Sequence, residues 1–304
     1  MSDVGSSLGW AVKYQKTIAL RLLIILKAAA MLPPKSLFGI LPLVPFLQVA
    51  SAVPFSGQGD NVTSARPPAF FLAGDSTTAI QSSNGGGWGV GFLSTLKTPA
   101  WGINYGLNGA TTVSFVKRGR WADVISSVQN STADYNVYVT IQFGHNDQKS
   151  SANISLSEYQ SNLENLATEV KELGGTPILV TPITRRKFSS EHVAIDSLAE
   201  QRNATIAAAN STDTWYIDLN QASREYVDAI GEEAAQVYDL NGNDTTHLND
   251  YGSVVFGNLV ADLILGHPPV IGDVDWKPSQ DDYLTQWIKP NQTIIREIWS
   301  GVPA

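Results

Sequence analysis

Short apolar runs alternate with amphipathic stretches along most of the chain. The runs are rich in β-branched and aromatic residues and predict five buried strands, at residues 69–73, 101–105, 135–143, 177–181 and 215–219. Between the strands, apolar side chains recur at helical spacing and predict helices, most clearly at 157–173, 191–209 and 251–265. Strands that alternate with helices are typical of a parallel sheet covered on both faces. We therefore predict an α/β fold.

The domain boundaries follow from changes in this pattern. No linker divides residues 65–268, so we expect a single domain there. Residues 269–304 are weakly periodic and carry Trp276, Trp287 and Trp299, which predicts a C-terminal extension packed on the domain. Residues 1–52 form a separate N-terminal extension.

The N-terminal extension has the layout of a secretory signal peptide. Residues 36–47 are apolar and are interrupted by Pro42 and Pro45. Lys35 precedes them, and a small-residue sequence typical of a cleavage site follows at 50–52. We expect cleavage and secretion, with no stable membrane association afterwards.

Two other interpretations of this extension stay open. Translation could begin at Met31, which would make residues 1–30 an alternative start. The segments 18–26 and 37–52 could instead anchor the chain in a membrane, although Arg21 and Lys27 interrupt the apolar pattern.

Seven Asn-x-Ser/Thr sequons accompany the signal-like segment. They lie at Asn61, Asn130, Asn153, Asn203, Asn210, Asn243 and Asn291. Such triplets are acceptor sites for N-linked glycans on exported proteins. Together they predict a secreted, extracellular glycoprotein.

The composition excludes several classes of protein. The 304 residues are 43% hydrophobic and 16% charged, a globular balance. The formal net charge is −8, and removal of residues 1–52, which hold five basic residues and one acidic residue, leaves −12. A chain with this excess of acidic residues cannot neutralise the phosphates of a nucleic acid. We therefore expect no nucleic-acid partner. The absence of cysteine excludes disulfides, thiolate catalysis and cysteine-ligated metals.

Metal-binding patterns are weak throughout the chain. The four histidines lie at least twenty residues apart, so they form no local metal motif. Residues 239–250 match part of a calcium-loop pattern, but Asp244 replaces its glycine and Asp250 its final glutamate. We therefore predict neither a metal nor another cofactor.

Four polar clusters point to the chemistry of the chain. They occupy residues 74–79, 104–109, 144–147 and 244–247. The first three directly follow predicted strands, and the fourth precedes the last predicted helix. Because ligands bind beyond the carboxyl ends of the strands in an open parallel sheet, we expect the clusters to form one site.

These clusters resemble the four sequence blocks of the SGNH (GDSL-type) hydrolases. The matching segments are Gly74-Asp75-Ser76, the block-two glycine Gly109, Gly144-His145-Asn146-Asp147 and Asp244-Thr245-Thr246-His247. Within that superfamily they are most similar to rhamnogalacturonan acetylesterases, and they follow the family's order across residues 70–265. The resemblance implies a three-layer α/β/α, flavodoxin-like SGNH hydrolase fold with a five-stranded parallel sheet.

The resemblance also implies roles for individual residues. Ser76 corresponds to the nucleophile, His247 to the general base and Asp244 to the carboxylate that orients the base. The backbone N–H groups of Ser76 and Gly109, with the side chain of Asn146, correspond to the oxyanion hole. The residue types suit these roles, because imidazole titrates near neutrality and can take the serine proton. A spacing of three residues lets Asp244 reach His247 through a local turn.

Each of these residues also has a structural interpretation. Ser76 could cap a following helix, Asn146 could cap a turn and His247 could lie on the surface. The presence of all four blocks in one chain favours the catalytic interpretation. We expect His145 and Asp147 to tie loops together within the third block.

The substrate is less well defined than the chemistry. Residues 110–112 read Ala-Thr-Thr where familiar members of the family carry Arg-Ser after the block-two glycine, so the contacts near the sugar differ. Basic residues follow the strand at 177–181 (Arg185 and Arg186) and the block-two loop (Lys117, Arg118 and Arg120). They could bind an acidic polymer or could be solvated loop charges.

The resemblance and the residues together predict a secreted serine esterase that works through an acyl-enzyme. We expect it to deacetylate a plant cell-wall polysaccharide, most of all rhamnogalacturonan I. The alternatives are an SGNH esterase for acetylxylan or for short-chain lipid or aryl esters, and a catalytically silent carbohydrate-binding protein. We expect a monomer whose partner is the acetylated polysaccharide.

Overall fold

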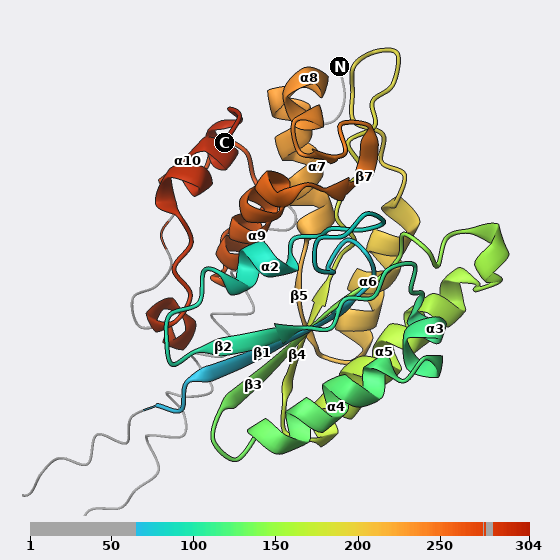
Figure 1. Cartoon of the computed structure of the whole chain (residues 1–304), viewed down its shortest axis with the longest axis vertical. Coiled ribbons are helices and arrows are strands. Elements are labelled where there is room, and N and C mark those ends of the chain that lie inside the picture. The colour runs from blue at the N-terminus through green and yellow to red at the C-terminus, as the bar shows by residue number, and fades with distance from the viewer. Residues whose placement is uncertain (1–64, 276, 278–281) are drawn as a thin grey trace, which may run out of the picture. The chain divides into compact units, whose positions relative to one another are not determined.

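The computed structural model describes residues 65–275, 277 and 282–304 (Figure 1). Its contacts divide the chain into two units, residues 1–61 and 62–304, and the features below belong to the second. The expected signal peptide, its alternatives and the sequon at Asn61 lie outside the described residues. Within the described part, no helix combines the length and the apolar character needed to cross a membrane.

A five-stranded parallel sheet forms the centre of the domain. Its strands are β1 (Pro68–Gly74), β2 (Trp101–Asn104), β3 (Asn136–Gln142), β4 (Thr176–Val180) and β5 (Trp215–Ile217). They lie in the order β2-β1-β3-β4-β5, and every neighbouring pair is parallel. The predicted α/β fold is confirmed, with strand boundaries that agree within two residues.

Side chains of β1 alternate between two hydrophobic cores, one on each face of the sheet. Phe70 and Leu72 belong to the first core, and Phe71 and Ala73 to the second. All four are fully buried. Successive side chains of a strand point to opposite faces, so a central strand that is apolar throughout must be covered on both sides.

Helices cover both faces and complete the three layers. The core around Phe71 is covered by α4 (Arg120–Ser131), α5 (Leu156–Glu172) and α6 (Ala199–Ser211). The core around Phe70 is covered by α2 (Gly89–Leu93), α7 (Leu219–Ile230) and α9 (Asp250–Ile264). The shorter elements are α3 (Thr112–Lys117), α8 (Glu232–Gln236) and an antiparallel hairpin of β6 (Asp239–Leu240) and β7 (Asp244–Leu248).

One predicted helix begins later than its apolar pattern. The sequence predicts a helix over residues 191–209, but α6 begins at Ala199. The preceding residues form a loop in which Phe188 pairs with Ala194 as an isolated bridge and His192 has a φ of 60°. Left-handed backbone at His192 is incompatible with a continuous right-handed helix. The other two predicted helices agree with α5 and α9 within one residue.

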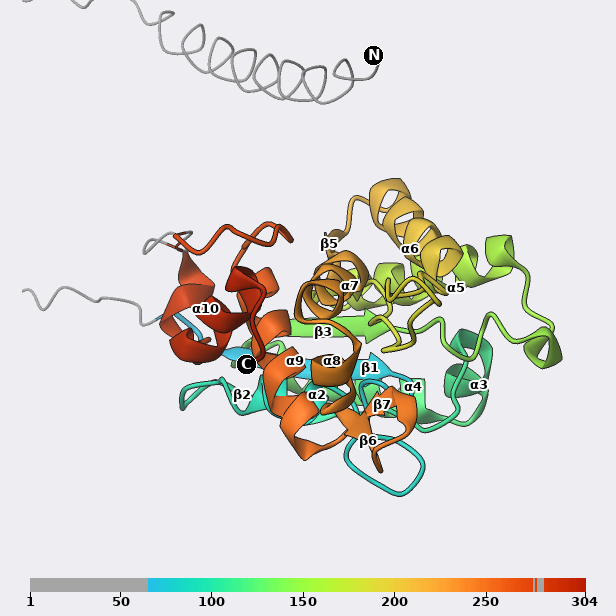
Figure 2. The same ribbon diagram turned by 90° about the horizontal axis from the view of Figure 1, so that it is seen from above.

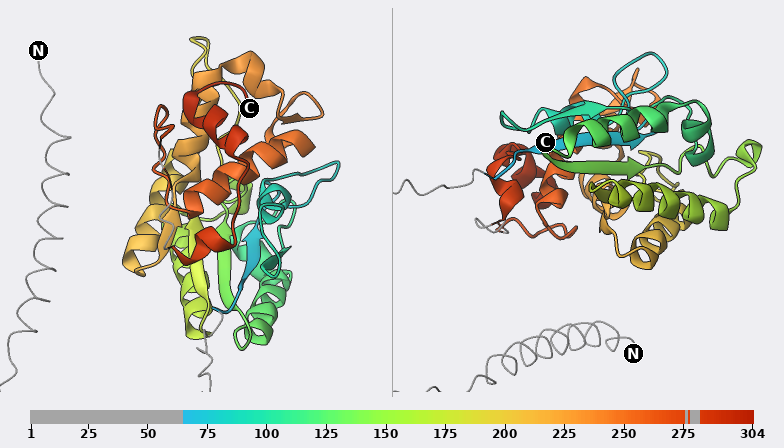
Figure 3. Two further views of the ribbon diagram at one scale, coloured as in Figure 1. Left: turned by 90° about the vertical axis from the view of Figure 1, so that its left-hand side faces the viewer. Right: turned by 90° about the horizontal axis from the view of Figure 1, so that it is seen from below.

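The C-terminal segment packs against α9 through α10 (Gln292–Ser300) (Figures 2 and 3). Trp299 is fully buried, its ring stacks on His267 with centroids 4.3 Å apart, and its Nε1 donates to Asp262 Oδ2 at 2.8 Å. Ile298 joins the same core as the apolar side chains of α9. The domain therefore includes its last helix as part of one hydrophobic layer.

A chain of buried polar side chains lies under the carboxyl ends of β1 and β3. Trp88 Nε1 donates to Gln142 Oε1 at 2.7 Å, and Gln142 Nε2 donates to Thr77 Oγ1 at 2.5 Å. Thr77 in turn donates to Asp75 Oδ1 from its hydroxyl at 2.7 Å and from its N–H at 2.8 Å. Burial raises the pKa of Asp75 to about 6, because desolvation disfavours the ionised carboxylate. This series of hydrogen bonds from Trp88 to Asp75 fixes the loop after β1 relative to β3.

We predict that Trp299→Ala lowers the free energy of unfolding by about 3–5 kcal/mol, because it removes a large buried ring and leaves a cavity. Urea denaturation followed by circular dichroism measures this loss. Trp215→Ala is the matched control, since this tryptophan is 37% exposed and its truncation should cost less. Equal losses for the two variants would contradict a structural role for the C-terminal helix.

The Asp75→Asn variant should become more stable relative to the wild type as the pH rises from about 4 to about 6. In this range the unfolded chain has already released the Asp75 proton, whose ordinary pKa is 3.8, while the folded chain still holds it. Raising the pH from about 4 to about 6 therefore destabilises the wild type by about 2 kcal/mol, which is most of the roughly 3 kcal/mol that the full shift in pKa corresponds to. Urea denaturation at several pH values measures the difference, and parallel profiles for the two proteins would contradict the prediction.

Candidate active site

The turn after β1 presents Ser76 at the carboxyl end of the parallel sheet. The carbonyl oxygen of Asp75 accepts the N–H groups of Thr78 and Ala79, which closes the turn tightly. The next helix, α2, begins only at Gly89, so Ser76 is not a helix cap. Its hydroxyl faces His247 instead, with Oγ 2.7 Å from the ring nitrogen Nε2.

The β6–β7 hairpin brings an acid and a base to this turn. Asp244 and His247 both lie on β7, and Asp244 Oδ2 is 2.7 Å from His247 Nδ1. The other carboxylate oxygen accepts the N–H groups of Thr246 and His247 at 3.0 and 3.1 Å. Burial acts to raise the pKa of Asp244, but these hydrogen bonds outweigh it and hold the pKa below its ordinary value. The ionised carboxylate keeps the histidine proton on Nδ1 and leaves Nε2 to accept from Ser76.

A glycine-rich loop joins the serine turn to the histidine strand. The N–H of Gly86 donates to the carbonyl oxygen of Ser76 at 3.2 Å, and its own carbonyl accepts the N–H of Leu248 at 2.8 Å. A Cβ atom on Gly87 would lie 1.9 Å from the carbonyl oxygen of Thr77, so only glycine fits there. The loop thereby fixes the distance between two segments that are far apart in the sequence.

Arg186 anchors the strand that carries Asp244 and His247. Its side chain is fully buried, and Nε donates to Asp239 Oδ1 at 2.5 Å. The terminal nitrogen Nη2 donates to the carbonyl oxygens of His247 at 2.6 Å and Asp244 at 3.3 Å. The expectation that Arg186 binds substrate is wrong, and so is the alternative of a solvated loop charge, because these internal bonds occupy the side chain and keep it from solvent. Its partner Asp239 is buried as well and pairs with this arginine rather than serving a calcium loop.

The other basic residues that could bind an acidic polymer are at least partly exposed. Arg185 donates from Nη1 to Ser197 Oγ at 2.8 Å. Lys117 and Arg118 are exposed at the C-terminal end of α3. Arg120 donates from Nε to the preceding loop and pairs with an aspartate of its own helix, so it is largely committed to the fold.

The three expected oxyanion-hole residues lie on the loops after β1, β2 and β3. Gly109 has a φ of 73°, a left-handed conformation that glycine adopts without strain. Asn146 is buried, and its Nδ2 donates to the carbonyl oxygen of Ala110 at 3.0 Å, which places the amide beside the Gly109 loop. Within the described residues, the N–H groups of Ser76 and Gly109 donate to no protein acceptor. Together with the second amide hydrogen of Asn146, they can serve an incoming oxygen.

The neighbours of Asn146 hold this loop in place. Asp147 Oδ1 accepts from the N–H of Thr112 at 2.8 Å and from its hydroxyl at 2.7 Å, which confirms that Asp147 ties loops together. His145 is buried with Nδ1 3.7 Å from Asp75 Oδ2, and burial lowers its pKa well below the ordinary value. A neutral imidazole therefore fills the space beneath the nucleophile turn.

No cluster of three or more histidine, aspartate or glutamate side chains in the described part of the chain is arranged to hold a metal ion. His192 is exposed and lies 3.1 Å from Glu232. The contacts of Ser76 with His247 and of His247 with Asp244 offer the chemistry of a serine activated by an acid–base pair.

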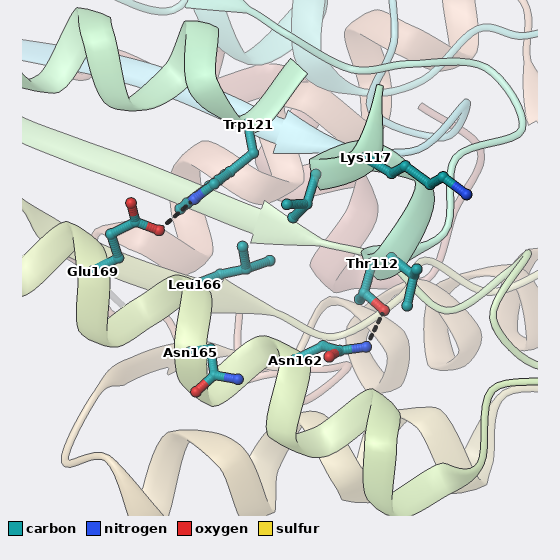
Figure 4. A pocket seen from close by; sticks show the side chains of 9 residues that line it. Thr112, Lys117, Trp121, Asn162, Asn165, Leu166 and Glu169 are labelled. Atoms are coloured by element: carbon teal, nitrogen blue, oxygen red, sulfur yellow. Dashed lines mark hydrogen bonds between the residues drawn. The ribbon is translucent and has the colours of Figure 1, made fainter. Parts of the chain in front are cut away.

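A pocket of about 420 Å³ lies between α3, α4 and α5 (Figure 4). Trp121 and Glu169 lie at one end, where the indole Nε1 donates to the carboxylate at 2.7 Å. At the other end Asn162 Nδ2 donates to Thr112 Oγ1 at 3.0 Å. Since Thr112 is bound to Asp147, the pocket wall is continuous with the loop that carries Asn146.

Comparisons with known proteins agree with this geometry. The GDSL-like lipase/acylhydrolase family model matches residues 72–255. The rhamnogalacturonan acetylesterase RhgT of Bacillus subtilis is 30% identical over 220 residues, which are 67% of this chain and 93% of RhgT. The probable rhamnogalacturonan acetylesterase YesY of the same organism is 28% identical over 63% of this chain and 89% of its own length.

A solved structure shows the same fold. The crystal structure of protein YxiM from B. subtilis superimposes with a TM-score of 0.57 at 24% identity, covering 65% of this chain and 56% of YxiM. The family match extends from β1 to α9 and so includes the serine turn, the oxyanion loops and the histidine strand. The chain therefore belongs to the GDSL-like lipase/acylhydrolase family and is a carboxylic ester hydrolase.

Proposed function

We propose that this chain is a secreted serine esterase that removes acetyl groups from rhamnogalacturonan I, a plant cell-wall polysaccharide. The observation that carries the proposal is the unbroken line from Ser76 Oγ through His247 to Asp244, with 2.7 Å at each of its two contacts. These are the separations at which a base takes the proton of a nucleophile.

The reaction proceeds through an acetyl-enzyme. His247 Nε2 takes the proton of Ser76 while Oγ attacks the acetyl carbonyl carbon, and the carbonyl oxygen becomes an anion bound by the donors of Ser76, Gly109 and Asn146. The tetrahedral intermediate collapses, the sugar oxygen takes the proton from His247, and the sugar alcohol leaves. Water then repeats the sequence on the acetyl group, releasing acetate and restoring Ser76.

Two observations favour an acidic polysaccharide as the substrate. The relatives RhgT and YesY are both named as rhamnogalacturonan acetylesterases, the second as a probable one. Lys117 lines the pocket whose wall continues through Thr112 and Asp147 into the loop of Asn146, and it pairs with no carboxylate among the described residues. At physiological salt the Debye length is about 8 Å, so a lysine beside the bound chain outweighs distant acidic surface.

Secretion is supported by the surface positions of the sequons. All sequon asparagines in the described part of the chain are exposed, namely Asn130, Asn153, Asn203, Asn210, Asn243 and Asn291. Exposure is what transfer of a glycan requires. These sites and the signal-like segment at residues 36–47 support export of the enzyme.

Ser76→Ala should reduce kcat on p-nitrophenyl acetate by at least about a thousandfold, because the acyl acceptor is lost. The fold should be unaffected, and circular dichroism and thermal unfolding check this. Ser83→Ala is the matched control, since Ser83 is an exposed serine of the same loop. Turnover by the Ser76 variant above a few per cent of wild type, in purified protein, would refute the nucleophile.

Lys117→Glu should lower kcat/KM for acetylated rhamnogalacturonan about 2- to 10-fold and leave p-nitrophenyl acetate hydrolysis unchanged, because one exposed charge contact becomes repulsive. Acetate release measures the polymer reaction. Arg118→Glu makes the same charge change outside the pocket lining and serves as the control.

Equal losses of kcat/KM in the two charge variants would show that the effect comes from the overall charge of the surface. The pocket would then have no specific role in substrate binding. A wild-type enzyme that deacetylates neutral acetylxylan faster than rhamnogalacturonan would replace the proposed substrate.

A further inference from the structure

Asn146 receives a contact that the proposed reaction does not explain. Lys149 Nζ donates to its side-chain oxygen Oδ1 at 2.7 Å. On the other side of the same amide, Nδ2 donates to the carbonyl oxygen of Ala110 at 3.0 Å. The protein therefore specifies both ends of this buried amide.

A tight turn brings the lysine back onto the asparagine. The N–H of Lys149 donates to the carbonyl oxygen of Asn146 at 3.2 Å, and the short helix at Ser150–Ala152 begins immediately afterwards. The residue is exposed overall, yet its amine reaches a side chain that is only 7% exposed. Among the described residues no carboxylate forms an ion pair with Lys149. The ammonium group of Lys149 instead donates to the amide of Asn146.

The chemistry of the two groups makes the contact directional. An amide presents an acceptor at one end and a donor at the other, and the two ends have nearly the same shape. An ammonium group can only donate, so it accepts one orientation of Asn146 and rejects the flipped one. In the flipped orientation Oδ1 would face the carbonyl oxygen of Ala110 and the developing oxyanion.

We propose that Lys149 is a positioning residue that holds Asn146 with Nδ2 toward the oxyanion and strengthens it as a donor. The inference rests on the proposed function and deepens it, since Lys149 acts only through Asn146. A charge-assisted bond to Oδ1 is stronger than a neutral one, and it polarises the amide so that its N–H groups donate more strongly. The benefit appears in the transition state, where the negative charge develops.

The test is a double-mutant cycle on p-nitrophenyl acetate. Asn146→Ala should lower kcat about 10²–10³-fold with little change in KM, as loss of an oxyanion-hole donor does. Lys149→Met should lower kcat by at least about tenfold, again with little change in KM, and Lys149→Arg should recover most of the loss, because guanidinium also donates. In the Asn146→Ala background, Lys149→Met should change kcat less than twofold.

A control variant and thermal unfolding separate this role from a structural one. Lys187→Met removes an exposed lysine from a different loop and should leave kcat and KM unchanged. Lys149→Met should unfold at the same temperature as the wild type.

Wild-type kcat in Lys149→Met, or an undiminished effect of that change in the Asn146→Ala background, would overturn the proposal. Full activity of Asn146→Ala would overturn it together with the oxyanion assignment. Activity of Ser76→Ala would instead refute the serine mechanism, so the two failures are distinguishable.

Discussion

The buried ion pair between Arg186 and Asp239 is the constraint on which the site depends. A charge without water must be paired, and removal of one partner of such a pair typically costs about 3–5 kcal/mol. Here the cation also donates to the backbone carbonyls of Asp244 and His247. The guanidinium therefore holds the two-stranded hairpin of β6 and β7 at the carboxyl end of the sheet, where the loop after β4 carries Arg186. These bonds help to fix the positions of Asp244 and His247.

The loops after β1 and β3 are held by buried hydrogen bonds rather than by an ion pair. Beneath the ends of β1 and β3 the polar chain from Trp88 to Asp75 replaces apolar packing, and Asp147 does the same for the start of α3. Hydrogen bonds are directional, whereas apolar contacts are not, so these loops are fixed in orientation as well as in position. Donors on three separate loops can then meet one substrate oxygen.

Much of this arrangement could be predicted from the sequence, because the signals are local. Continuous apolar runs locate the five strands, and polar clusters directly after them locate the site. The helix α4 has a local signal of the same kind, because Trp121, Val124 and Val128 recur at helical spacing and are buried on one face. Even the pairing of Asp244 with His247 follows from their spacing, although the structure makes it within a strand rather than a turn.

The remaining features depend on contacts between distant residues. Arg185 and Arg186 are adjacent and chemically identical. The tertiary positions of Asp239, 53 residues further on, and of the strand after it bury one of them and leave the other partly exposed. The late start of α6 has a more local origin. The loop before it is closed mainly by its own backbone hydrogen bonds, such as that from the N–H of Ile195 to the carbonyl oxygen of Lys187 at 2.8 Å, and Ala194 adds one bond to the distant Asp228. The contact of Lys149 with Asn146 is local, but one turn among several possible for that sequence produces it.

Ser76 and His247 are close in space but far apart in the sequence, so the ribosome makes them at different times. The two residues are separated by 171 positions, and the arginine that supports the histidine strand lies between them. At about 5–20 residues per second, a ribosome needs roughly ten to thirty seconds to extend the chain from the serine to the histidine. Throughout that interval the nascent chain carries a serine without its base. The growing chain therefore lacks the base that activates Ser76 until Asp244 and His247 have been made, and the core helices α9 and α10 follow later still.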